Sequence, residues 1–276
     1  MTEPLLRIDD PADPRIAGFL SIKERDLTGR QGRFIAEGTV VLRMLAAAHR
    51  EGRGIAAEAI LLLESRVAGV AELLAQFPPD VPVYVAASRV FDAIAGFNMH
   101  RGVLALGRRD AAPGRDALIA GLPQSSLVLA ACGISNHDNM GSLFRNAAAF
   151  GVDAVLMDST SCDPMYRKAI RVSVGSVLTL PFAREGTAAE LIERLQTAGF
   201  VVWGLSPRGT ADINAIPPAP RTALLVVGTE GEGLPETILS QIRTARIRQR
   251  PGLDSLNVAM AAGIALHQVA SINGRI

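Results

Sequence analysis

The sequence predicts an α/β protein, and three observations support that fold class. Short apolar runs alternate along the chain with longer segments whose apolar residues recur at helical spacing. In the second half the runs are apolar almost throughout, as in Ser126–Ala131 and Ala223–Val227, which is typical of parallel strands covered by helices on both faces. Hydrophobic residues make up 49% of the 276 residues and charged residues 20%, a composition that can bury a sizeable core.

The first half is predicted to form a small α/β domain. Its strands are expected at 33–36, 59–63, 81–85 and 102–106, and its helices at 39–50, 67–76 and 88–95. The segment 108–121 then combines charges, a Pro-Gly pair and small residues, which indicates a domain boundary. We therefore expect a first domain over 1–110, a linker over 111–122 and a second domain over 123–276.

The second domain is predicted to hold a parallel sheet. Strands are expected at 126–131, 154–157, 176–180, 200–204, 223–227 and 245–247, and helices at 141–150, at 188–198, briefly from 235, and from about 255 onward. Asp254 or Ser255 is the expected N-cap of the last helix. Ligands of such sheets bind at the carboxyl ends of the strands, so the functional residues are expected in the loops that follow the strands.

Composition excludes several classes of protein. The 28 basic and 27 acidic residues nearly cancel, which argues against a bulk polyanion binder of the histone kind. Cys132 and Cys162 form neither a metal-type cluster nor a disulfide framework, so we expect a cytoplasmic, reducing location and no metal. The N-terminus lacks the layout of a signal peptide, and the uncharged stretch 255–273 is interpreted as a buried helix rather than a membrane span.

Three loops after predicted strands stand out. The first, 135–146, is expected to turn sharply at Asn139 to Gly141, which places Arg145 one helical turn beyond Gly141 on the same face. An arginine beside such a turn is a candidate anion site, although a lone helical arginine is more often solvated.

The second loop, 227–235, is rich in glycine but matches neither a P-loop nor the dinucleotide fingerprint. Glu230 and Glu232 would repel a phosphate and tolerate a cationic ligand, such as an adenosine that carries a sulfonium and an ammonium group. A plain turn is the alternative interpretation. The third loop, 246–258, places Asn257 in the first turn of the last helix, with three arginines before it that face either RNA or water.

In their order and spacing the three loops resemble the SpoU (TrmH-like) family of RNA 2′-O-ribose methyltransferases, within the SPOUT superfamily. The motifs are Asn139-Met-Gly-Ser-Leu-Phe-Arg145, Gly228-Thr-Glu-Gly-Glu-Gly233 and Ser255-Leu-Asn-Val258, and the resemblance covers 123–272. The first domain looks like the L30e-like RNA-binding domain that accompanies this family, with Phe34-Ile-Ala-Glu-Gly38 and Arg101-Gly-Val-Leu-Ala105 as the matching segments.

The resemblance implies a trefoil knot in the C-terminal domain, a homodimer, and S-adenosylmethionine as cofactor. It implies methylation of a ribose 2′-hydroxyl in RNA without a metal, and rRNA is favoured over tRNA. A tRNA 2′-O-ribose methyltransferase and a catalytically idle RNA-binding relative are the alternatives. A nicotinamide-dependent oxidoreductase is disfavoured because the Gly-x-Gly-x-x-Gly fingerprint is missing.

Site roles follow from the resemblance, position by position. Arg145 is the catalytic arginine, either as general base or as a group that only orients the hydroxyl. Asn139 shapes the substrate side, Glu230 is the acid of the glycine loop, and Ser255 and Asn257 support the reacting ribose and the first loop. The cofactor-binding positions are Gly228, Thr229, Ile247 and Leu256. The chain departs from the family pattern at His137-Asp138, at Thr229 and at 247–249.

Overall fold

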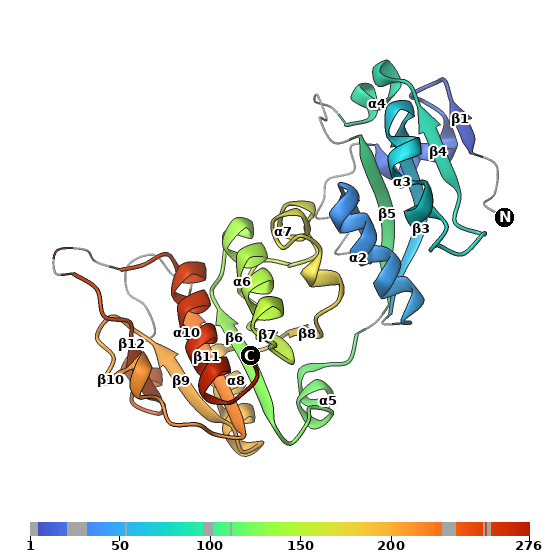
Figure 1. Ribbon diagram of the computed structural model, residues 1–276. Coiled ribbons are helices and arrows are strands. Elements are labelled where there is room, and N and C mark those ends of the chain that lie inside the picture. Colours follow the sequence, from blue (N-terminus) through green and yellow to red (C-terminus); the bar gives the residue numbers. More distant parts are fainter. Residues whose placement is uncertain are drawn as a thin grey trace. The chain divides into compact units, whose positions relative to one another are not determined.

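The structure is a computed structural model that describes residues 5–20, 32–52, 54–95, 102–110, 112–227, 236–250, 252 and 255–276. The chain divides into two compact units (Figure 1). The first unit contains residues 1–112 together with 165–179, and the second contains 113–164 and 180–276. Each unit has its own sheet.

The sheet of the first unit has five strands in the order β1-β4-β3-β5-β2. They are β1 (Leu6–Ile8), β2 (Arg33–Glu37), β3 (Ile55–Leu63), β4 (Val83–Ala86) and β5 (Val103–Arg109). Strand β4 pairs in parallel with β1 and β3, whereas β5 pairs antiparallel with β2 and β3, so the sheet is mixed.

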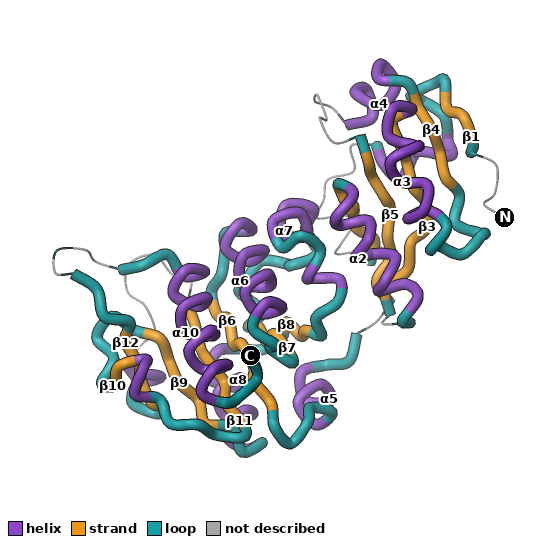
Figure 2. Tube along the Cα trace, viewed as in Figure 1, coloured by secondary structure: helices purple, strands orange, loops and turns teal. Residues whose placement is uncertain are grey.

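Helices and 3₁₀ turns surround this first sheet (Figure 2). They are η1 (Pro14–Phe19), α2 (Thr39–Arg50), η2 (Glu64–Arg66), α3 (Val67–Leu74) and α4 (Ser88–Ala95). Ile16, Phe19 and Phe91 pack with Leu61 in one apolar cluster of the sheet, because alternate residues of a strand point to the same face. The structure has a strand or helix at each place predicted in this half of the chain, and β1 and η1 in addition.

A segment from later in the chain completes the first unit. It contains α7 (Arg167–Val172) and η3 (Ser176–Leu178). Between them Gly175 has a φ of 87°, and a Cβ at this position would lie 2.7 Å from the Cβ of Met44 in α2. The strand predicted at 176–180 is wrong, because Gly175 turns the chain against α2 and Leu178 N–H donates back to Gly175 O (2.9 Å).

The sheet of the second unit has seven strands in the order β10-β12-β9-β11-β6-β7-β8, and every pair is parallel. They are β6 (Ser126–Cys132), β7 (Ala154–Met157), β8 (Phe182–Arg184), β9 (Val201–Leu205), β10 (Ala211–Asp212), β11 (Arg221–Val227) and β12 (Arg243–Arg246). All residues of β6 and β7 are buried, which explains why these strands read as unbroken apolar runs.

Helices cover both faces of this sheet, as predicted (Figure 1). They are α5 (Arg115–Ala120), α6 (His137–Ala149), α8 (Ala188–Thr197), α9 (Glu236–Leu239) and α10 (Val258–Ile272), with η4 (Ile213–Ala215) after β10. Helices α5 and α8 bury Ile119 and Leu195 on one face. On the other face α6 and α10 lie side by side and bury Phe144 and Leu266.

The region predicted as a linker contains α5. Ile119 of this helix is 5% exposed and packs in the core of the second unit, and Arg115 N–H donates to Glu185 Oε1 (2.6 Å) just beyond β8. The break between the units therefore falls at Ala112 and Pro113. The predicted trefoil knot concerns how the chain threads through its own loops, and it stays a prediction.

Candidate functional site

The loop from β6 to α6 carries the first motif. Its left-handed residue is Gly133, with a φ of 64°, and Asn136 is the N-cap of α6. Asn136 Oδ1 accepts from Asp138 N–H (2.7 Å) and from Asn139 N–H (3.4 Å). The sharp turn predicted at Asn139 to Gly141 is wrong, because the turn comes six residues earlier and these residues are already helical.

A hydrogen bond joins the third motif, 255–258, to the first motif, 139–145. Asn257 Nδ2 donates to Asn139 Oδ1 over 2.9 Å, between residues 118 positions apart. Asn257 is also the N-cap of α10, since its Oδ1 accepts from Ala259 N–H (2.9 Å) and Met260 N–H (3.3 Å). The helix begins at Val258, so the expectation that Ser255 caps it is wrong, and Asp254 lies outside the described residues.

A second asparagine, which the sequence analysis missed, fixes how α6 and α10 pack. Asn146 Nδ2 donates to Ala259 O (2.7 Å), and a Cβ at Gly263 would come within 3.0 Å of the same nitrogen. The small residue at 263 therefore lets the two helices approach. An asparagine beside a run of three alanines was the available signal, because a polar side chain on an apolar helix face needs a partner.

Arg145 lies on α6 and is exposed. Among the described residues, no hydrogen bond or ion pair joins its guanidinium to Asn139, Ser255 or Asn257. The geometry therefore leaves this cation facing solvent, where a phosphate can reach it in bidentate fashion.

The remaining predicted residues divide into two groups. Gly228, Thr229 and Glu230 lie outside the described residues. Ser255 is exposed, whereas Ile247 and Leu256 are half-buried. Ser255 and Leu256 lie immediately before Asn257, the N-cap of α10.

Two arginines at or just after the end of β12, before the third motif, pair with one carboxylate, that of Asp212. Asp212 Oδ2 accepts from Arg248 (2.5 Å) and Asp212 Oδ1 accepts from Arg246 Nε (3.1 Å). The hydrogen bond from Arg248, with help from Arg246, lowers the pKa of Asp212 to about 2. Arg248, considered in the sequence analysis as facing RNA or water, thus has a protein partner.

Neither cysteine is suited to act as a nucleophile. Burial raises the pKa of Cys132 to about 12 and that of Cys162 to about 11. Both thiols are therefore protonated at neutral pH, and the thiolate is the reactive form of cysteine. Among the described residues, no group of His, Cys, Asp and Glu is arranged to hold a metal ion. No described helix has the length and apolar character to span a membrane.

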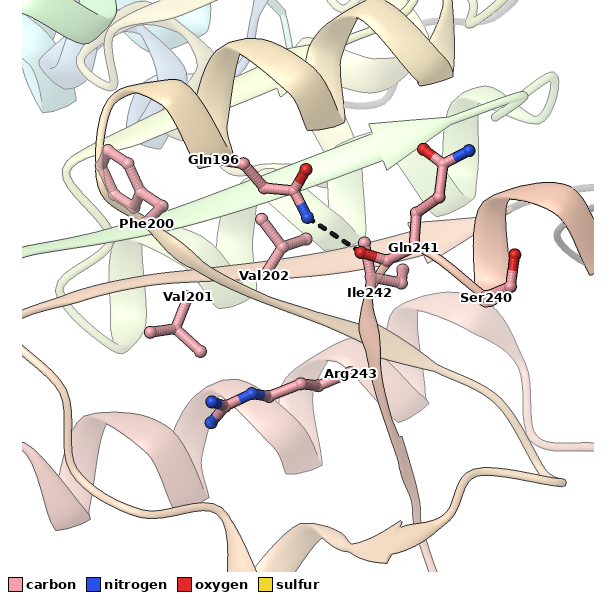
Figure 3. Close-up of a pocket in the computed structure, with 8 residues that line it drawn as sticks. All are labelled: Gln196, Phe200, Val201, Val202, Ser240, Gln241, Ile242 and Arg243. Atoms are coloured by element: carbon pink, nitrogen blue, oxygen red, sulfur yellow. Dashed lines mark hydrogen bonds between the residues drawn. The ribbon is translucent and has the colours of Figure 1, made fainter.

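A cavity of about 350 Å³ lies elsewhere in the second unit, at the amino ends of β9 and β12 (Figure 3). Its lining comes from the end of α8, the start of β9 and the segment before β12, and Gln196 Nε2 donates to Gln241 O (2.9 Å) across it. Ligands of parallel α/β sheets bind at the opposite, carboxyl ends of the strands. The cavity is therefore separate from the contact between Asn139 and Asn257.

Solved RNA methyltransferases share this fold. A rRNA methyltransferase from Sinorhizobium meliloti with AdoMet bound aligns with a TM-score of 0.77 and 23% identity, over 97% of this chain and 98% of its own. A structure described as an RNA 2′-O ribose methyltransferase aligns with a TM-score of 0.77 and 25% identity, over 98% and 100% of the two chains. The second unit and the first together thus have the α/β fold of these RNA methyltransferases.

The family follows from the sequence. Residues 126–267 match the SpoU rRNA Methylase family, and the chain belongs to that family. An uncharacterized tRNA/rRNA methyltransferase of Mycobacterium tuberculosis is 35% identical over 269 residues, which cover 94% of this chain and 89% of that protein. The 23S rRNA (guanosine-2′-O-)-methyltransferase RlmB of Vibrio vulnificus is 32% identical over 148 residues, which cover 52% and 58% of the two chains.

Proposed function

We propose that this protein transfers a methyl group from S-adenosylmethionine to a ribose 2′-hydroxyl of RNA, with rRNA as the favoured substrate. The observation that carries the proposal is the hydrogen bond between Asn257 and Asn139, because it joins two of the three family motifs at the carboxyl end of a parallel sheet. The similarity to the 23S rRNA (guanosine-2′-O-)-methyltransferase RlmB and to the RNA 2′-O ribose methyltransferase structure supports it.

The described part of the cofactor loops fits S-adenosylmethionine. The half-buried side chains of Ile247 and Leu256 offer it apolar contact, and Ser255 and Leu256 stand at the entry to α10. By family position Gly228 and Thr229 would hold it from the second loop, and Glu230 carries a charge that suits a cation. When bound, the cofactor supplies a methyl group on an activated sulfonium.

This chain's own residues position the nucleophile. The exposed guanidinium of Arg145 anchors a phosphate next to the reacting ribose, while Asn139, Ser255 and Asn257 line the approach to its hydroxyl. Alignment of the hydroxyl supplies much of the rate. The 2′-hydroxyl must lose its proton, and Arg145 either takes that proton or only orients the group that releases it to solvent.

The proposal extends to the rest of the chain. Residues 1–110 form an L30e-like domain that binds RNA, and residues 123–276 form the methyltransferase domain. Two large apolar side chains of α10, Met260 (60% exposed) and Ile264 (40% exposed), lie one helical turn apart on the same face. A second copy of the chain would cover them, which supports a homodimer. The proposal includes a cytoplasmic location, and the free thiols of Cys132 and Cys162 fit its reducing conditions.

Methyl transfer tests the proposal directly. The protein is incubated with labelled S-adenosylmethionine and with rRNA and tRNA from a strain that lacks its gene, and 2′-O-methyl sites are mapped. We expect label in rRNA and its loss with Arg145→Ala. Label in tRNA would support the tRNA alternative, and cofactor binding without label in either RNA would support the idle relative. Sedimentation of wild type and Met260→Glu tests the dimer, which we expect the variant to weaken.

A further inference from the structure

A buried polar cluster at the carboxyl end of β7 belongs to none of the three motifs. It consists of Asp158, which is 5% exposed, and Ser161, which is 2% exposed. Asp158 Oδ1 accepts from Ser161 Oγ (2.7 Å), Gly133 N–H (3.0 Å) and Ser161 N–H (3.1 Å), and Oδ2 accepts from Thr160 Oγ1 (2.6 Å). A buried carboxylate is retained at such a place only when hydrogen bonds satisfy it, as these do.

The cluster holds the first two residues of the loop from β6 to α6, Gly133 and Ile134. Gly133 N–H donates to Asp158, and Ile134 N–H donates to Ser161 Oγ (3.1 Å). Cys162 N–H donates in return to Ile134 O over 2.7 Å. Ile134 is fully buried, and the N-cap Asn136 follows two residues later. The hydrogen-bond partners of Gly133 and Ile134 therefore lie in the loop after β7.

That loop is itself braced from the next strand. Arg184, the last residue of β8, donates from one guanidinium nitrogen to Ser161 O (3.0 Å) and to Ser159 O (3.3 Å). Ser159 N–H donates to Gly186 O over 2.8 Å. The carboxyl ends of β6, β7 and β8 thus form one hydrogen-bonded layer under the start of α6.

We propose that Asp158 and Ser161 are positioning residues that set where α6 begins and thereby place Asn139 and Arg145. They act through the helix and touch neither substrate nor cofactor. A helix moves as a rigid element, so a shift at residues 133 and 134 displaces every side chain that α6 presents. Displacement of about 1 Å can cost on the order of a hundredfold in rate even when the altered residue is remote from the chemistry. The activity readout rests on the proposed function.

The opposite end of β6 offers a matched control. Asp153 Oδ2 accepts from Leu127 N–H (2.8 Å) at the amino end of the same strand, and from Arg275 (2.6 Å). Asp153→Asn removes the charge of a carboxylate that also holds a β6 backbone N–H, but at the end remote from the three motifs. If both carboxylates only stabilise the fold, the two substitutions should lower Tm without a difference in kcat. If Asp158 positions α6, kcat should fall only when Asp158 is changed.

The experiment compares Asp158→Asn, Asp158→Ala, Ser161→Ala and Asp153→Asn. For each we measure kcat per folded molecule, the Kd for S-adenosylmethionine and the Tm. We expect kcat to fall about a hundredfold for Asp158→Ala and about tenfold for Asp158→Asn and Ser161→Ala, with cofactor Kd unchanged. For Asp153→Asn we expect a lower Tm and an unchanged kcat. An unchanged kcat in folded Asp158→Ala, or an equal loss of kcat in Asp153→Asn, would overturn the proposal.

Hydrogen exchange supplies a readout that does not depend on catalysis. We expect Asp158→Asn and Ser161→Ala to speed amide exchange at the start of α6, over residues 139–142, and to leave α8 unchanged. Equal amide exchange rates at the start of α6 in the wild type and both variants would overturn the proposal. This test remains available if Asp158→Ala does not fold. If wild-type protein methylates no RNA, the proposed function fails, and exchange at α6 still decides whether Asp158 and Ser161 position it.

Discussion

Near each end of β6 an aspartate carboxylate accepts a hydrogen bond from a backbone N–H, but the two carboxylates serve different purposes. At the amino end, Asp153 accepts from Leu127 N–H and is held by Arg275, which also donates to Gly151 O (2.8 Å). At the carboxyl end, Asp158 accepts from Gly133 N–H and is held by the hydroxyls of Thr160 and Ser161. The first set ties the C-terminus of the chain to the sheet, whereas the second supports the helix that presents Asn139 and Arg145.

The difference shows how a parallel sheet separates stability from function. Every strand of the second unit runs the same way, so all of its strand-to-helix loops open at one edge. The contact between Asn139 and Asn257 lies at that edge. At the amino edge a guanidinium and a carboxylate pair in a partly buried position, and no predicted site residue among those described is found there.

The largest effect is expected from Asn257. Asn257→Ala removes the contact with Asn139 and the cap of α10, so we expect kcat/KM for methyl transfer to fall about a hundredfold and the free energy of unfolding to fall by about 1 kcal/mol. Asn257→Ser keeps a capping oxygen but is too short to reach Asn139. It should therefore restore stability and not activity; recovery of activity in this variant would show that the contact is dispensable.

The amino edge should show the reverse pattern. Arg275→Ala removes hydrogen bonds to Asp153 and to Gly151 O, and we expect the free energy of unfolding to fall by about 1–3 kcal/mol. Urea denaturation measures this loss. Because the change lies at the edge remote from the motifs, kcat per folded molecule should stay at the wild-type value. A large fall in kcat with unchanged stability would break the comparison between the two edges.

A smaller effect concerns pH and the carboxyl edge. The pKa of Asp212 is lowered to about 2 by its hydrogen bond from Arg248, with a further bond from Arg246. A lowered carboxylate pKa stabilises the folded state above the unfolded value of about 3.9 and loses that contribution as pH falls toward 2. Asp212→Asn should therefore flatten the dependence of Tm on pH between about 4 and 2. A dependence identical to that of the wild type would contradict this pairing.

The smallest effect is expected from the cysteine that ends β6. With its pKa raised to about 12 by burial, Cys132 should react with iodoacetamide at pH 8 far more slowly in folded protein than in urea. Mass spectrometry of the alkylated chain measures this. Cys132→Ala should leave methyl transfer unchanged, since the side chain only fills space there. Rapid alkylation of the folded protein would show that the carboxyl edge opens to solvent.

Much of this protein could be predicted from residues close together in the sequence. The apolar runs of β6, β7 and β11 predicted buried parallel strands, because a strand covered on both faces consists mostly of apolar residues. The helices at 39–50 and 88–95 follow from apolar spacing alone. The motifs that contain Asn139 and Asn257 can likewise be recognised from residue types and spacing within short segments.

Other features depend on residues far apart in the chain. Residues 176–178 have strand-like composition, yet Gly175 and its close approach to Met44 wind them into a 3₁₀ turn. Asn257 caps α10 locally through Oδ1, but the contact of its Nδ2 with Asn139 depends on how α6 and α10 pack. In the same way Asp158 and Ser161 gain a role only because β7 lies beside β6.

The sequence by itself thus determined the element types, the alternating order and the three motifs, since these depend on periodicity and residue chemistry within short segments. Only the tertiary structure decided which polar groups satisfy one another across the sheet, because a buried donor finds its acceptor by proximity in space. For the loop that begins α6, that acceptor is Asp158, 25 residues away in the chain and one strand away in the fold.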